Sequence, residues 1–203
     1  MKQISFFCVA LVIINTWSQP FMRPGKNIIE QSINAAPSGK GVNLPDTIDA
    51  TSLFTLSDAE KILGEPAHLA DSASTVPGVA SKTSVNDSVF PIKKMARSYK
   101  CAYEANAEDK KTGRTGKVYF LFEQYPLVSS AATVYSYYKR SNQTHPGFKE
   151  RHDLGDEAWS GDSPVSVYVR KGNILFGVKV NKMTSHTSSD GFNEVVKKIA
   201  TAF

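Results

Sequence analysis

The strongest constraint on the fold is a pair of alternating segments, separated by a two-residue turn, near the C-terminal end of the sequence. Residues 165–170 carry valine at every second position, and after Gly172 and Asn173 the apolar alternation resumes over 174–180. This pattern predicts strands with one buried face, and the Gly-Asn pair suits a tight hairpin turn. We therefore expect an antiparallel sheet, whose apolar face other elements must cover.

Upstream, two more alternating segments predict a second hairpin. Residues 95–105 carry two tyrosines and Cys101 on one face, and residues 117–125 carry valine and phenylalanine at alternate positions. The polar stretch 110–116, which contains two glycines, is expected to join them as a loop. A shorter candidate strand covers residues 148–154, so we expect five strands in all.

A helix is predicted over residues 55–66, where the folded part of the chain begins. Ser57 and Glu60 have capping-box spacing, Gly64 suits the position after the last turn, and a proline two residues later prevents continuation. Residues 67–94 follow with weak patterning and no sustained period. We expect a long irregular segment there, containing at most a short strand.

Two further helices complete the expected fold. Apolar residues recur at helical spacing over 128–140, and Ser188 precedes a last helix whose apolar stripe runs to Phe203. The predicted order is helix, two strands, helix, three strands, helix. Because hairpins dominate and each helix has one apolar stripe, we expect an α+β two-layer sandwich: a mainly antiparallel sheet with helices packed on one face.

The first residues, 1–18, have the layout of a secretory signal peptide. Lys2 supplies a positive charge, and residues 4–14 form an uncharged apolar run that small residues follow. The run is shorter than the roughly 20 residues that span a bilayer, although an uncleaved segment would still act as a membrane anchor. Residues 19–50, rich in Pro, Gly, Asn and Ser, predict a flexible tether, which leaves one domain over 51–203. We therefore expect an exported protein, periplasmic or secreted.

Export also decides the role of the two cysteines. Cys8 lies inside the apolar run and lacks the small preceding residues of a lipidation signal, so cleavage would remove it. Cys101 would then be the one cysteine of the mature protein, which excludes an intramolecular disulfide. Its position in an alternating strand predicts a buried thiol.

The sequence lacks the motifs of several enzyme classes. The stretch 113–117 resembles a phosphate-binding loop, but its spacing is too short and Val118 stands where a magnesium-binding Ser or Thr is required. No serine lies in a Gly-x-Ser-x-Gly elbow. The four histidines have neither helical pairing nor a cysteine cluster beside them, so we expect no metal site and no cofactor.

One dense polar cluster, residues 151–157, supports two interpretations. The catalytic site of an exported hydrolase would use His152 as an acid or base together with Asp156 or Glu157. A turn would instead use Gly155 for positive φ and the carboxylates as acceptors of backbone N–H groups. We favour the turn, and with it a non-enzymatic domain that binds a small ligand or an exported protein partner.

The chain has a net charge of +5, and part of it clusters around the first predicted hairpin. Such a patch could bind an anionic polymer or lipid headgroups, but a solvated strand face is the commoner outcome and export argues against nucleic acid. We expect membrane contact only through an uncleaved signal peptide. The candidate binding residues of the patch are Lys93, Lys94, Lys110, Lys111, Arg114 and Lys117.

Several short motifs resemble exported bacterial domains of unknown function. They are Leu56-x-x-Ala59-Glu60-x-Ile62-Leu63-Gly64-Glu65-Pro66, Cys101-x-Tyr103, Leu154-Gly155-Asp156-Glu157-Ala158-Trp159 and Arg170-Lys171-Gly172-Asn173. Those domains include secreted lipoproteins and outer sensor modules of membrane proteins, and several are similar to the Mog1/PsbP-like α/β sandwich. The resemblance covers residues 53–203 and implies no catalytic residues. This chain departs from it by lacking a lipidation cysteine and a partner for Cys101.

Three Asp-Ser/Thr-aliphatic triplets resemble the O-glycosylation sites of exported proteins from Bacteroidetes-type bacteria. They place Thr47, Ser72 and Ser88 in the expected tether or in the irregular segment, where a glycan would be accommodated. We therefore treat these three hydroxyl groups as candidate glycosylation sites.

Overall fold

The structure, a computed structural model of the chain, describes residues 48–75, 90–93, 95–162 and 165–203. All of them belong to the compact unit Pro37–Phe203. The predicted signal peptide, the tether before Ile48, and the candidate residues Thr47, Ser88 and Lys94 lie outside the described residues.

The unit is a mixed α+β fold built on an antiparallel sheet of seven strands, so the predicted α+β class and the mainly antiparallel sheet are confirmed. The strand order is β1-β2-β3-β7-β6-β5-β4. The helices are α1 (Ala50–Leu53), α2 (Leu56–Leu63), α3 (Phe90–Lys93), α4 (Val128–Asn142) and α5 (Ser189–Thr201). The strands are β1 (Ala67–Thr75), β2 (Arg97–Asp109), β3 (Arg114–Gln124), β4 (Lys149–Arg151), β5 (Glu157–Asp162), β6 (Val165–Lys171) and β7 (Ile174–Lys182).

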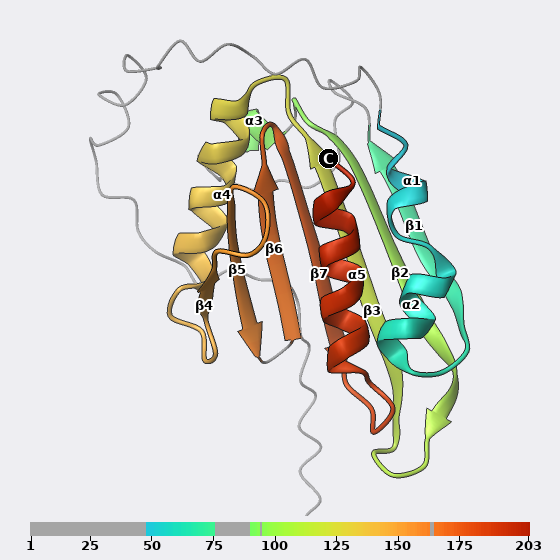
Figure 1. Cartoon of the computed structure of the whole chain (residues 1–203). Coiled ribbons are helices and arrows are strands. Elements are labelled where there is room, and N and C mark those ends of the chain that lie inside the picture. Colours follow the sequence, from blue (N-terminus) through green and yellow to red (C-terminus); the bar gives the residue numbers. More distant parts are fainter. Residues whose placement is uncertain (1–47, 76–89, 94, 163–164) are drawn as a thin grey trace, which may run out of the picture. The chain divides into compact units, whose positions relative to one another are not determined.

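The two predicted hairpins both form. In the β6–β7 hairpin Lys171 pairs with Ile174 across a two-residue turn, and Gly172 has a φ of 57° that favours glycine there. The β2–β3 hairpin is longer than expected, because β2 continues past Ala105 after an irregularity between Glu104 and Glu108. Between the hairpins, β3 pairs with β7, which joins them into one sheet (Figure 1).

Part of the segment 67–94 was wrongly expected to be irregular. Residues 67–75 form β1, a nine-residue strand at one edge of the sheet that pairs with β2. The pattern is weak because an edge strand is largely exposed, so apolar residues do not alternate with polar ones. Ser72 therefore lies in a strand opposite Cys101, not in a loop, although it is exposed. A second unpredicted strand, β5, pairs with both β4 and β6.

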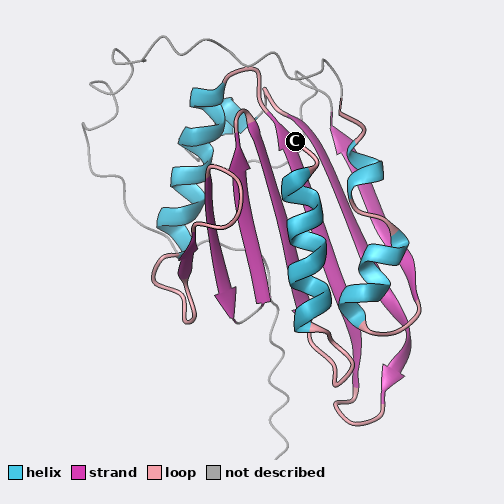
Figure 2. Ribbon diagram, in the orientation of Figure 1, coloured by secondary structure: helices cyan, strands magenta, loops and turns pink. Residues whose placement is uncertain are grey.

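Helices cover both faces of the sheet, so the predicted packing on one face is not confirmed. Successive residues of a strand point to opposite faces. Phe176 of β7 belongs to the larger core, with α1, α2 and α5, whereas Leu175 belongs to a second core with α4. Likewise Val167 packs in the larger core, and Tyr168 packs against the second. Figure 2 shows α1, α2 and α5 on the near face.

The first long helix, α2, begins with a capping box that lies two residues earlier than predicted. The pair is Thr55 and Asp58, not Ser57 and Glu60: Thr55 Oγ1 accepts from the Asp58 amide, and Asp58 Oδ2 accepts from the Thr55 amide. The predicted end is confirmed, since Gly64 ends the helix with a φ of 73°.

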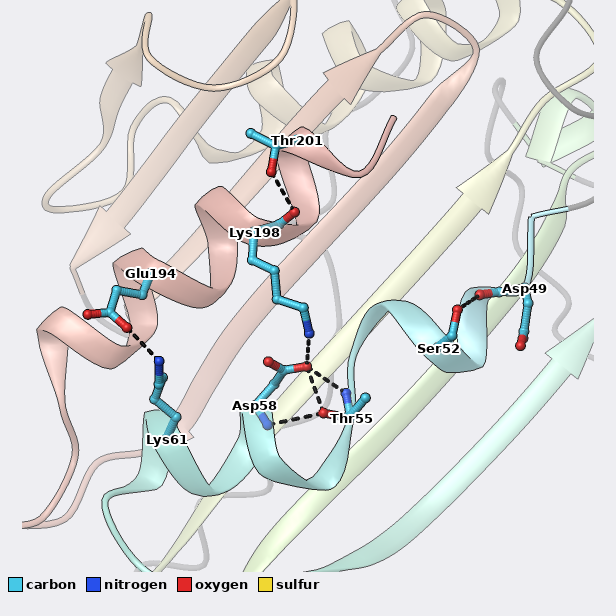
Figure 3. Close-up of polar contacts among 8 residues, drawn as sticks. All are labelled: Asp49, Ser52, Thr55, Asp58, Lys61, Glu194, Lys198 and Thr201. Carbon is cyan, nitrogen blue, oxygen red and sulfur yellow. Dashed lines mark hydrogen bonds and ion pairs between the residues drawn. The ribbon is translucent and has the colours of Figure 1, made fainter.

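Ion pairs tie α2 to α5 on the surface of this helix layer. Lys198 Nζ lies 2.7 Å from Asp58 Oδ2, and Lys61 Nζ lies 2.6 Å from Glu194 Oε2 (Figure 3). Asp58 is buried, which disfavours its charge, but the bonds from Lys198 and Thr55 outweigh that effect and lower its pKa. The first long helix, α2, and the last helix, α5, are therefore held together by charge as well as by apolar packing.

The packed domain begins slightly earlier than residue 51. Asp49 caps α1 by accepting from the Thr51 amide, and Ala50 is buried. Phe54, at the end of α1, has no exposed surface, and its ring lies 5.1 Å from that of Phe120 and 5.8 Å from that of Tyr103. The segment that leads into α2 is thus part of the core.

Candidate binding pocket

The two carboxylates of the predicted polar cluster both bind one arginine on the neighbouring strand. Arg170 Nη1 donates to Asp156 Oδ2 at 2.9 Å, and Arg170 Nε donates to Glu157 Oε2 at 2.6 Å. Asp156 Oδ2 also accepts from the Gly172 amide at 2.8 Å. These bonds fasten the start of β5 to the end of β6 and to the β6–β7 turn. The two carboxylates thus have a structural role, as the turn interpretation expects.

The structure does not bring His152 to these carboxylates. His152 is exposed, and within the described ranges it forms no hydrogen bond or ion pair with Asp156 or Glu157. The pKa of Glu150 is lowered mainly by the hydrogen bond from Lys139 and by the charge of that lysine. His152 makes the smallest contribution to this shift. The residues proposed for the hydrolase therefore form no acid–base pair here.

The third carboxylate of the cluster, Asp153, is paired as well. Arg151 binds it through two parallel bonds, each 2.7 Å long. These bonds are the main reason why the pKa of Asp153 falls to about 2, and the charge of Lys197 contributes less. At neutral pH Asp153 is therefore ionised and already paired.

A pocket opens beside this cluster. It has a volume of about 290 Å³ and lies between the loop that follows β4, the end of β6 and the last turns of α5. Its volume is just below the range of roughly 300–1,000 Å³ that is typical of small-molecule sites. The lining residues are Asp153, Leu154, Gly155, Lys171, Lys197, Ala200 and Thr201.

Two lysines give the pocket its chemical character. Among the described residues, neither Lys171 nor Lys197 has a carboxylate within ion-pair distance, and Lys171 Nζ makes only a 3.4 Å hydrogen bond to the Ala200 carbonyl. Ammonium groups near an apolar wall are suited to a carboxylate or phosphate group. Neither lysine was predicted as a site residue from the sequence, and Lys197, which is far from the cluster along the chain, reaches it only through the packing of α5.

The predicted basic patch is not assembled. Lys93 precedes β2, whereas Lys110, Lys111 and Arg114 lie at the other end of that strand, whose 13 residues span about 43 Å. Lys93 lies over the ring of Tyr138, 4.3 Å from its centroid. Lys117 pairs with Glu104 at 3.0 Å. The candidates are thus divided between the two ends of the sheet.

Near the β2–β3 turn, one buried carboxylate holds two loops together. Asp109 accepts from the Ser185 amide at 2.7 Å, from the Lys111 amide at 2.9 Å and from the Thr112 hydroxyl at 2.8 Å. The bond from Ser185 contributes most to holding the pKa of Asp109 well below its usual range. His186 Nε2 lies 4.0 Å away. With every oxygen occupied, Asp109 has a structural role.

Cys101 is buried as predicted, with 3% of its surface exposed, and burial raises the pKa of its thiol to about 11. In the part of the chain that the structure covers, no three His, Cys, Asp or Glu side chains are grouped to bind a metal ion. The same part contains no helix with the length and apolar character needed to cross a membrane.

Comparisons with family models, with curated proteins and with solved structures find no match to this chain. The candidate site is therefore defined by its own geometry: a small pocket with two lysines, next to acidic residues that arginines already neutralise.

Proposed function

We propose that this chain is an exported, non-enzymatic binding domain, and that its pocket takes the carboxylate or phosphate group of a small ligand or of an exported partner. One observation carries this proposal: Lys171 and Lys197 line the same pocket and, among the described residues, neither has a carboxylate within ion-pair distance, while Asp153 is bound to Arg151. An incoming anion would supply the missing counter-charge.

The predicted signal peptide over 1–18 supports export, and the predicted tether over 19–50 would give the domain freedom to reach a partner. The resemblance to exported domains, several of them similar to the Mog1/PsbP-like sandwich, implies no catalytic residues and agrees with a binding role. A hydrolase built on His152, Asp156 and Glu157 receives less support, since Arg170 binds both carboxylates.

The test is a titration of the isotopically labelled full chain with sodium phosphate and with sodium acetate, followed by amide NMR. We expect saturable shifts at the amides of Lys171, Lys197 and Ala200, because these residues line the pocket. In the double variant Lys171→Met/Lys197→Met the shifts should disappear. Lys182→Met is the matched control, since Lys182 is exposed at the far end of β7.

Unsaturated shifts that rise linearly with salt, or saturable shifts that persist in the double variant, would remove the pocket from the proposal. The same spectra report whether the double variant remains folded, because the core amides keep their dispersion only in the native state. A loss of binding with unchanged core signals thus assigns the effect to the two ammonium groups.

A further inference from the structure

Three large apolar side chains are exposed at one end of the sheet. Met95 is 49% exposed, Leu127 60% and Val128 44%. The pairing of Arg97 with Gln124 brings their two connections together, because Met95 lies two residues before one partner and Leu127 three residues after the other. We call Met95, Leu127 and Val128 the apolar tip.

The backbone beneath the apolar tip is held in place. Tyr125 exchanges two hydrogen bonds with Asn173 of the β6–β7 turn: the Tyr125 amide donates to the Asn173 carbonyl at 2.9 Å, and Asn173 Nδ2 donates to the Tyr125 carbonyl at 2.5 Å. Tyr125 and Ala96 are themselves buried in the second core. The exposed side chains therefore project from a fixed frame and are not an effect of a loosely packed loop.

Two cationic residues lie beside the apolar tip. Lys93 and Arg97 flank Met95, and Arg97 is exposed. Figure 1 shows α3, the start of α4 and the β6–β7 turn together at this end, opposite the β2–β3 turn.

We infer that the apolar tip docks the domain on an anionic lipid surface. Apolar side chains that project from two neighbouring connections can enter the boundary between headgroups and acyl chains, and cations beside them are attracted by anionic headgroups. The cations beside the apolar tip favour an anionic lipid surface over a protein partner, because the core of a protein interface is depleted of charged residues. This inference is independent of the proposed ligand pocket, since it requires neither Lys171 nor Lys197.

The test follows the apolar tip itself, because the N-terminal apolar run could bind membranes by its own means. In the full chain with Cys8→Ser, an environment-sensitive fluorophore is attached at Leu127→Cys; Cys101 is buried and reacts slowly. The matched control carries the fluorophore at Lys182→Cys, an exposed position at the opposite end of the sheet. Vesicles of phosphatidylglycerol are compared with vesicles of phosphatidylcholine.

We expect a blue shift of the label at position 127 with the anionic vesicles only, and none at position 182. About 0.5 M NaCl should abolish most of the shift, because screening lengths then fall to a few Å. In a further variant labelled at 127, the substitutions Met95→Ser/Val128→Ser should weaken vesicle binding about tenfold or more, because two apolar side chains that would enter the membrane are lost. Lys171→Met/Lys197→Met should leave the shift at 127 in place, which separates this inference from the ligand pocket.

Equal shifts at both positions would overturn the inference, since they would mean that the chain binds through its N-terminal residues. An unshifted label at 127 in the presence of bound vesicles would do the same. A blue shift that grows with protein concentration in the absence of lipid would assign the apolar tip to contacts between copies of the chain instead.

Discussion

Replacing Phe54 by alanine should remove a large part of the stability of the domain, although Phe54 lies before the first long helix. Its side chain has no exposed surface and contacts the rings of Phe120 and Tyr103. Truncation of a fully buried phenylalanine costs about 3–5 kcal/mol, through lost transfer free energy and the cavity left behind. In a domain of this size, that corresponds to a fall in Tm of roughly 6–20 °C.

The assay is urea unfolding of the full chain, followed by far-UV circular dichroism. Leu56→Ala is the matched control: Leu56 is two residues away but 43% exposed, so its loss should cost less than about 1 kcal/mol. Phe54→Leu should fall between the two, because it conserves most of the volume.

Equal, small losses for Phe54→Ala and Leu56→Ala would refute the conclusion that the segment before α2 belongs to the core. A lower slope of the transition in the alanine variant would have another meaning, since it would report a native state that has already opened around α1.

Three further predictions concern single residues. Gly64→Ala should destabilise by more than about 1 kcal/mol in thermal melts, because Gly64 has a φ of 73° and a methyl group would meet the His186 carbonyl; an unchanged Tm would contradict this. The pKa of Asp109 is lower in the folded than in the unfolded state, so its contribution is present above pH ~4 and is lost as pH falls further. The Tm difference between the native chain and Asp109→Asn should therefore shrink on acidification, and a constant difference would exclude the carboxylate as its source. Cys101 should resist a thiol reagent at pH ~8 until urea unfolds the chain, because its pKa is about 11 and it is buried; rapid labelling of the native protein at Cys101 would contradict this.

Local sequence patterns were sufficient to predict an element where one of its faces is buried and the other is exposed. The β6–β7 hairpin, the start of α5 at Ser188 and the end of α2 at Gly64 were all predicted from neighbouring residues. β1 was missed for the opposite reason, because an edge strand that is exposed along most of its length has no alternation to detect.

Two errors arose because tertiary contacts decide between local options. Ser57–Glu60 and Thr55–Asp58 both have capping-box spacing, and the second is selected in the fold, where Lys198 of α5 also binds Asp58. The placement of helices on both faces was equally hidden, since an apolar stripe shows that a helix is covered but not from which side.

The candidate site was predicted only in part. The cluster 151–157 does border the pocket, through Asp153 and Gly155, but the two lysines come from β6 and α5. These residues are far apart in the sequence and meet there only because α5 packs on the face of the sheet. Such a contact cannot be predicted from the spacing of residues along the chain. The catalytic hypothesis depended on nearness along the chain, whereas the cross-strand partner Arg170 determines what Asp156 and Glu157 do.

The pairing of α2 with α5 has a consequence for when this chain can fold. The buried face of α2, near the start of the described residues, is completed by α5 (Ser189–Thr201), which follows more than 120 residues later. The central pairing of β3 with β7 likewise requires residues that are synthesised 50 to 65 positions later. A nascent chain with this topology cannot complete the packing of α2 and β3 until the residues of β7 and α5 have been synthesised.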